Sequence, residues 1–180
     1  MASSKIFQEK QLSANNQNSD KMMLPESLKS EIDHWIAKYP NDQKQSALIP
    51  ALLMAQKHHQ GWLSPTLIQA VADYLQVPHI QAYEVATFYS MLELKPIGRN
   101  LICICTNVSC MLNGSDTISS YFEKRLSLHF GETSEDQRFT LKEVECLGAC
   151  TNAPVMTING TYYENITVEK LDEILQETAE

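Results

Sequence analysis

Residues 99–110 read RNLICICTNVSC, and residues 139–150 read FTLKEVECLGAC. Each stretch opens with a short run rich in apolar and β-branched residues, which is typical of a buried strand. Each stretch then ends in a pair of cysteines, so the same order of strand and cysteine pair occurs twice in the chain. If the two strands are neighbours that end at one edge of a sheet, the two pairs meet there.

The chain has five cysteines, all in its C-terminal half. Four of them form the two pairs: Cys105, Cys110, Cys146 and Cys150. A chain without a secretory signal seldom uses cysteines as disulfides, so this spacing favours metal or redox chemistry. Four thiolates are the usual ligands of a [2Fe-2S] cluster. Loops of this length let each pair bind one iron while backbone N–H groups approach the sulfurs.

Three other interpretations of the cysteines stay open. A structural zinc site usually spaces its ligands as C-x₂-C, which is tighter than either pair here. A dithiol redox enzyme favours C-x-x-C, which is absent, and simple burial explains two loop-borne pairs poorly. The fifth cysteine, Cys103, lies within the first predicted strand on the same face as Cys105. It could in principle replace Cys105 as a ligand, but we expect a small buried apolar side chain.

The first half of the chain carries a helical pattern. Apolar residues recur on one helix face in the stripe Leu28, Ile32, Trp35, Ile36 and Tyr39. A second helix is expected to end near His59, and Ser64 followed by Pro65 is a typical helix start. Pro78 is expected to open a fourth helix. The connections are short, which predicts a small antiparallel bundle.

The pattern changes near residues 95–98, and the rest of the chain predicts the order β-α-β-β-α. Ser115 or Asp116 is expected to cap the first helix of this part. Asn159-Gly160 predicts a tight hairpin, because the pair supplies two positive φ angles. A last helix is expected after Thr167, with buried positions at Val168, Leu171, Ile174 and Leu175.

The fold class expected from these patterns is α+β, with a helical bundle followed by a thioredoxin-like domain. We divide the chain into a disordered polar tail (1–24), a helical bundle for partner docking (25–95) and a cluster-binding domain (96–180). A net charge of −8 argues against nucleic acid as a partner. No apolar run approaches the length of about 20 residues that a membrane span needs, so direct membrane insertion is not expected.

The N-terminal sequence lacks the apolar core of a secretory signal, which favours a cytoplasmic location. The six glycines form no G-x-G-x-x-G or G-x₄-G-K-[ST] motif. The usual sequence signatures of nucleotide binding are therefore missing.

Longer motifs carry a resemblance to a known family. They are GWLSP (61–65), EVATFYSML (84–92), CTNVSC (105–110), NGSD (113–116) and ECLGACTNAP (145–154). The chain resembles the thioredoxin-like [2Fe-2S] ferredoxins that serve as E subunits of bacterial NADH:quinone oxidoreductase, or respiratory complex I. The resemblance extends over about residues 25–175. Cys103 lies outside the ligand set of this family.

The resemblance implies one [2Fe-2S] cluster, with one iron on Cys105 and Cys110 and the other on Cys146 and Cys150. It implies an electron-transfer subunit of an oxidoreductase with no catalytic residue of its own. The expected partners are the F subunit, which carries flavin and binds NADH near this cluster, and the large iron–sulfur G subunit. The expected location is the peripheral arm at the inner face of the plasma membrane. A homologous subunit of an NAD-linked hydrogenase or formate dehydrogenase, or a free-standing ferredoxin, remains the alternative.

Overall fold

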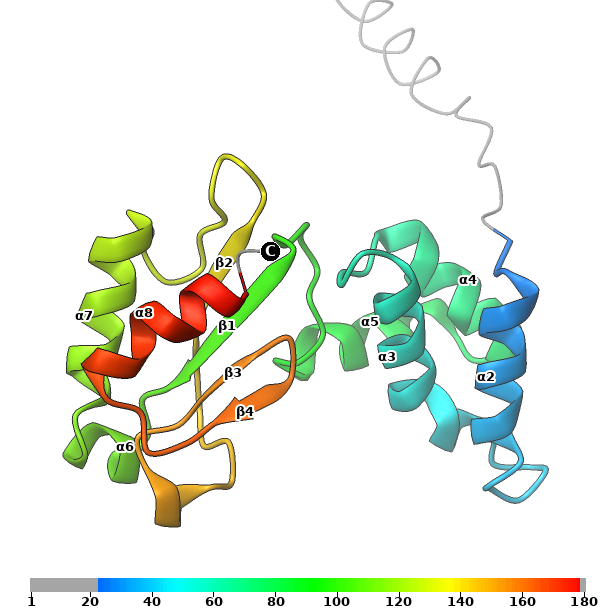
Figure 1. Cartoon of the computed structure of the whole chain (residues 1–180). Helices are drawn as coiled ribbons and strands as arrows, with labels where there is room; N and C mark the ends of the chain where they lie inside the picture. Colours follow the sequence, from blue (N-terminus) through cyan, green and yellow to red (C-terminus); the bar gives the residue numbers. More distant parts are fainter. Residues whose placement is uncertain (1–22, 179–180) are drawn as a thin grey trace, which may run out of the picture.

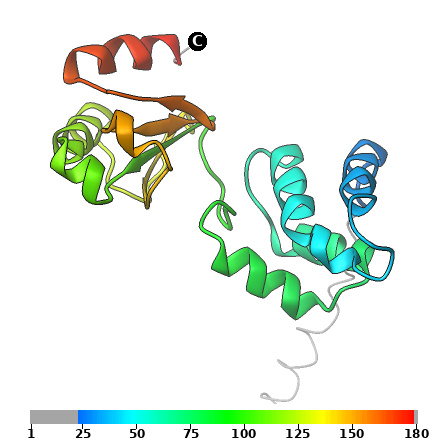
Figure 2. The ribbon, with the colours of Figure 1, turned by 90° about the horizontal axis from the view of Figure 1, so that it is seen from below.

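The computed structural model describes residues 23–178 as two groups of elements joined by a linker. Helices form the first group, and a four-stranded sheet with its own helices forms the second (Figures 1 and 2). The predicted polar tail lies almost entirely outside the described residues. Within 23–178, no helix combines the length and apolar character needed to cross a bilayer.

The first group is a helical bundle. Its elements are α2 (Glu26–Ile36), the 3-10 turn η2 (Lys44–Ala47), α3 (Leu48–His58), α4 (Pro65–Leu75) and α5 (His79–Phe88). The predicted start of α4 is confirmed, because the Ser64 hydroxyl accepts a hydrogen bond from the Leu67 amide at 3.2 Å, with Pro65 in the first helical position.

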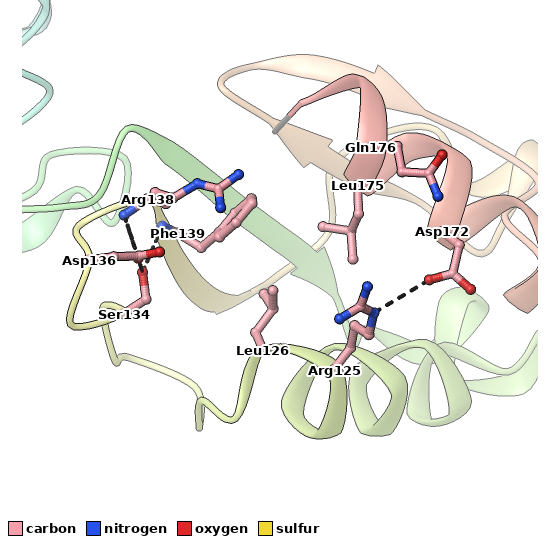
Figure 3. A pocket seen from close by; sticks show the side chains of 9 residues that line it. All are labelled: Arg125, Leu126, Ser134, Asp136, Arg138, Phe139, Asp172, Leu175 and Gln176. Carbon is pink, nitrogen blue, oxygen red and sulfur yellow. Dashed lines mark hydrogen bonds and ion pairs between the residues drawn. The ribbon is translucent and has the colours of Figure 1, made fainter. Parts of the chain in front are cut away.

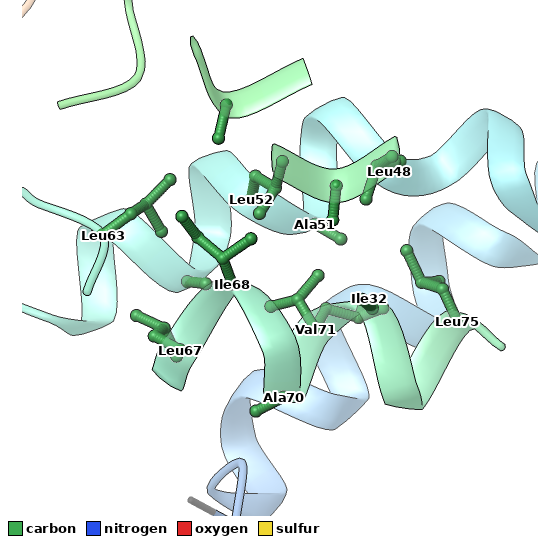
Figure 4. Close-up of a cluster of buried hydrophobic side chains, with 14 of the residues drawn as sticks. Ile32, Leu48, Ala51, Leu52, Leu63, Leu67, Ile68, Ala70, Val71 and Leu75 are labelled. Atoms are coloured by element: carbon green, nitrogen blue, oxygen red, sulfur yellow. The ribbon is translucent and has the colours of Figure 1, made fainter. Parts of the chain in front are cut away.

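The bundle encloses its own apolar core, part of which Figure 4 shows. The predicted stripe on α2 contributes Leu28 and Ile32, which are fully buried. Helix α5 is different, because Ala82 and Ala86 face the core while Phe88 at its end is 80% exposed. The EVATFYSML motif therefore serves the core only in part and leaves a large aromatic ring on the surface.

The second group is built on a sheet of strand order β2-β1-β3-β4. Its strands are β1 (Asn100–Cys105), β2 (Phe139–Val144), β3 (Met156–Ile158) and β4 (Thr161–Tyr163). Strands β1 and β2 are parallel neighbours, and Cys105 pairs with Val144 at the end of their ladder. Both cysteine loops consequently leave the sheet at the same edge, as the sequence predicts.

Two helices cover one face of this sheet. Helices α7 (Ser115–Leu126) and α8 (Val168–Glu177) pack on the face that carries Ile102, Ile104 and Leu141. The hairpin between β3 and β4 has positive φ angles at Asn159 (51°) and Gly160 (82°), which confirms the predicted turn.

Three details differ from the sequence expectations. A short helix α6 (Val108–Leu112), which starts between Cys105 and Cys110 and contains Cys110, was not predicted. The residue before α7 is Gly114 at φ 93°, a conformation that suits glycine, so neither Ser115 nor Asp116 is the cap. Val168 was expected to be buried but is 38% exposed, because it stands at the first position of α8, before the helix meets the core.

Side chains tie the linker to both groups. From the bundle, the Gln56 amide donates to the Met91 carbonyl at 3.0 Å and accepts from the Glu93 amide at 2.6 Å. From β2, the Lys142 ammonium donates to the Ser90 carbonyl at 2.6 Å and to the Glu93 carboxylate. The segment after α5 is thus held between the bundle and the open face of the sheet.

Gly98 provides a test of how closely the linker joins the sheet. A Cβ atom at this position would lie 2.8 Å from both the N and C atoms of the Phe139 backbone. Relief of this clash requires a shift of the Phe139 backbone, which disturbs the packing of the sheet. We therefore expect Gly98→Ala to lower the free energy of unfolding by about 1–3 kcal/mol. Chemical denaturation measures this change, with exposed Arg99→Ala as the control; equal stabilities of the two variants would contradict it.

Candidate metal centre

The four predicted ligands lie on two loops that follow β1 and β2. Cys105 is the last residue of β1 and Cys110 lies in α6. Cys146 follows β2, and Cys150 begins the 3-10 turn η3 (Cys150–Asn152). Cys105 and Cys110 are each only 2% exposed, whereas Cys146 and Cys150 are exposed. The site therefore has an inner, buried pair and an outer, accessible pair.

The thiols within each pair are hydrogen-bonded, and the two pairs are close enough to interact electrostatically. The Cys146 and Cys150 sulfurs are 3.3 Å apart. The Cys110 thiol is hydrogen-bonded to Cys105, and the charge of Cys150 also acts on it. A negative charge on Cys105 in turn acts on Cys150. All four predicted ligands are thus brought together at one end of the second group.

Burial and backbone contacts make the thiols chemically unequal. Burial, followed by the hydrogen bond to Cys105, raises the pKa of Cys110 to about 11. The Gly148 amide, 3.4 Å from the Cys146 sulfur, and the Cys150 thiol lower the pKa of Cys146. The same contact raises the pKa of Cys150, because its thiol proton is held by Cys146. Cys146 therefore loses its thiol proton more readily than Cys110 does.

The surroundings of the thiols fit an iron–sulfur cluster. Val155 is buried against the inner pair, and Leu147, Ala149 and Ala153 complete an apolar wall. Gly148 has a φ of 83°, a left-handed conformation that points its amide at sulfur, as expected for a hydrogen bond to a cluster ligand. Within residues 23–178, no three His, Cys, Asp or Glu side chains gather closely enough for a single metal ion. The thiols form two pairs, and each pair could hold one iron of a two-iron core.

Cys103 faces a different environment. It lines a cavity of about 650 Å³ between the bundle and the open face of the sheet, together with Met91, Leu101 and Lys142. Burial raises the pKa of its thiol. Cys146 borders the same cavity, so the cavity extends from the linker to the outer cysteine pair.

A second cavity, of about 300 Å³, lies between α7, α8 and the loop before β2 (Figure 3). Arg125 and Asp172 form an ion pair across its wall at 3.5 Å, and Phe139 and Leu175 add apolar surface. None of the predicted site residues lines this cavity.

Sequence reasoning missed the side chains that join the two ligand loops. Asn107 and Ser109 lie between the first two cysteines and bond to the second loop, and Tyr162 on β4 bonds to it from the hairpin. The available signal was the polar character of CTNVSC, in which three of the four residues between the cysteines can donate hydrogen bonds.

Fold and site together define an iron–sulfur protein with a thioredoxin-like half. The chain belongs to the thioredoxin-like [2Fe-2S] ferredoxin family, whose profile matches residues 32–179. It is 51% identical to the E subunit of NADH-quinone oxidoreductase from Rickettsia felis, over 79% of this chain and 85% of the relative. The corresponding protein of Rickettsia prowazekii is 48% identical, over 79% and 80% of the two chains.

A eukaryotic relative and a solved structure extend this likeness. NADH dehydrogenase (ubiquinone) flavoprotein 2, mitochondrial, of Dictyostelium discoideum is 44% identical over 80% of this chain and 60% of its own length. An NAD⁺-reducing [NiFe]-hydrogenase superposes with a TM-score of 0.61 at 19% identity, over 71% of this chain and 22% of the other, which shows a shared fold.

These findings confirm several sequence predictions. The α+β fold, the [2Fe-2S] cofactor and the class of electron-transfer subunit in NADH-quinone oxidoreductase are all confirmed. Membership in an assembly of several subunits follows from the same relatives.

Unequal thiols predict an order of chemical labelling in the cluster-free chain. Because its pKa is lowered and its side chain is exposed, Cys146 should react first with iodoacetamide near neutral pH, and Cys110 last. The rate at Cys146 should fall only when the pH drops below its lowered pKa, whereas Cys110 needs alkaline solution. Peptide mass mapping from pH 6 to pH 10 measures both profiles, and equal labelling of the two residues would contradict the geometry.

Proposed function

We propose that Cys105, Cys110, Cys146 and Cys150 hold the [2Fe-2S] cluster of this electron-transfer subunit, with one iron on each pair. The observation that carries the proposal is the parallel pairing of β1 and β2, which delivers both cysteine loops to one sheet edge. The bound cluster would supply one-electron chemistry. No residue of this chain is assigned a catalytic role, since the chain's own task is to hold the cluster and present it.

The two pairs support different parts of that task. Cys105 and Cys110 are buried beside Val155, so this wall excludes water from the inner half of the site. Cys146 and Cys150 are exposed, so electrons would enter and leave from their side. The Gly148 amide stabilises negative charge on the Cys146 sulfur.

The partners are inferred from the missing nucleotide-binding motifs and from the exposed apolar side chains of the chain. We assign NADH and flavin to an F subunit that approaches the cluster, and the large iron–sulfur G subunit as a second neighbour. Phe88 at the end of α5 and Met91 in the segment after it offer exposed apolar surface to such neighbours. The assembly would sit in the peripheral arm of the complex, at the inner face of the plasma membrane.

Substitution of single cysteines tests the ligand set. We expect wild-type chain to contain equal amounts of iron and acid-labile sulfide and to give a rhombic EPR signal after reduction. Cys146→Ser and Cys110→Ser should each lose most of the cluster or shift the EPR g values, because oxygen replaces a thiolate ligand. Iron and sulfide analysis with EPR of the reduced protein measures both effects.

Cys103→Ser is the matched control, because it removes a thiol two residues from Cys105 and should leave the cluster content unchanged. Cluster loss in Cys103→Ser, together with an unchanged cluster in Cys146→Ser or Cys110→Ser, would contradict the assignment. A colourless protein that contains zinc would favour a structural zinc site instead.

The identity of the co-purifying subunits distinguishes the proposed complex from a related hydrogenase or formate dehydrogenase. Purified from its native membranes through an affinity tag, the chain should bring along a flavoprotein that oxidises NADH with a quinone acceptor. Hydrogenase or formate dehydrogenase subunits in the same fraction would instead favour the alternative, a homologous subunit of one of those enzymes. The hydrogenase structure shares the fold of this chain. Elution of all native chain at about 20 kDa would favour a free-standing ferredoxin.

A further inference from the structure

Backbone pairing between the two ligand-bearing segments stops before the ligands are reached. The ladder of β1 and β2 ends with Cys105 opposite Val144, and one further bond joins the Thr106 amide to the Val144 carbonyl at 3.2 Å. Cys110, Cys146 and Cys150 all lie beyond that point. Regular structure of the sheet therefore leaves the separation of the two loops undetermined.

Beyond the end of the ladder, side-chain hydrogen bonds join the two ligand-bearing segments. The Thr106 hydroxyl donates to the Glu143 carboxylate at 2.7 Å, and the Asn107 amide donates to the Glu145 carboxylate at 2.6 Å. The Ser109 hydroxyl donates to the backbone carbonyl of Cys150 at 3.1 Å. Every polar side chain between the first two cysteines thus bonds to the second segment, which lies far along the sequence.

The hairpin holds the second loop from its other side. The hydroxyl of Tyr162, on β4, donates to the Leu147 carbonyl at 2.9 Å, directly after Cys146 in CLGAC. Ser109 holds the same loop at its end, through the carbonyl of Cys150. The exposed cysteine pair lies on either side of Leu147, so two side chains from different elements fix the backbone that carries it.

We propose that Ser109 and Tyr162 are positioning residues for the cluster, because their hydroxyls hold the outer ligand loop at a fixed distance from the inner cysteine pair. This inference rests on the proposed ligand set. Neither hydroxyl touches a thiol in the hydrogen bonds observed, and both act through backbone carbonyls. The two hydrogen bonds reduce the conformational freedom of a loop that has no regular structure. The loop is then already in its binding conformation when the cluster binds.

Retention of the cluster tests this role in the full-length, cluster-loaded chain. Ser109→Ala and Tyr162→Phe each remove one hydroxyl and little else. Each should lose its cluster to an iron chelator about fivefold faster than wild type, the factor that corresponds to one hydrogen bond. Both should also broaden the EPR lines of the reduced cluster, because the loop then samples more conformations. Ser109→Thr keeps the hydroxyl and should restore the wild-type rate and line width.

Asn113→Ala is the matched control for Ser109→Ala. Its amide donates to the Ser109 carbonyl at 2.7 Å, so this exposed bond belongs to the same segment but does not cross to the second loop. We expect it to leave chelation rate and EPR lines unchanged. Wild-type rates and line widths in both Ser109→Ala and Tyr162→Phe would overturn the inference. Absence of a cluster from wild type would instead overturn the proposed ligand set.

If Ser109→Ala fails to fold, Tyr162→Phe decides the matter alone, because its ring still covers the same surface. If Tyr162→Phe then loses its cluster to the chelator at the wild-type rate, the role of Tyr162 is overturned. The proposal that two hydroxyls hold the loop is overturned with it. Thermal unfolding of the cluster-free chains is the second measurement. An equal loss of melting temperature in Asn113→Ala and Ser109→Ala, with equal chelation rates, would show an ordinary structural bond and overturn the inference.

Discussion

Parallel pairing of β1 with β2 is the constraint on which the rest of the site depends. Parallel strands run in the same direction, so the segments that follow them emerge at one edge. The register that sets Cys105 opposite Val144 places the second cysteine pair just beyond the same edge. A slip of one residue would turn every side chain of one strand to the opposite face, and would separate the loops. The apolar residues under α7 and α8 oppose such a slip.

The helical bundle and the sheet with its helices each have an apolar core of their own. The bundle core ends with Leu92, and the core beneath the sheet begins with Ile102. Between them, Lys142 on β2 binds the segment that Gln56 holds from the bundle. These bonds join the bundle to the strand that leads to Cys146, because Lys142 and Cys146 lie on one continuous segment.

Much of this arrangement could be predicted from the sequence because its signals are local. Ser64-Pro65 and Asn159-Gly160 each determine their own backbone, and both were predicted correctly. Helix α6 was missed because its five residues are too few to show a helical period. The bonds from Ser109 and Tyr162 could not be predicted, since each depends on a partner that only the folded chain brings near. Local chemistry predicts the ligand set, whereas the hydrogen bonds that hold the two loops depend on the tertiary structure.

Cys103 shows why spacing alone does not define a ligand. It lies on the same face of β1 as Cys105, and two residues of strand separate their side chains by about 7 Å. That displacement places Cys103 opposite Lys142 and beside the linker cavity, away from the loop that carries Cys150. We therefore keep Cys103 outside the proposed ligand set, because the strand that supplies Cys105 holds its neighbour too far from the loops.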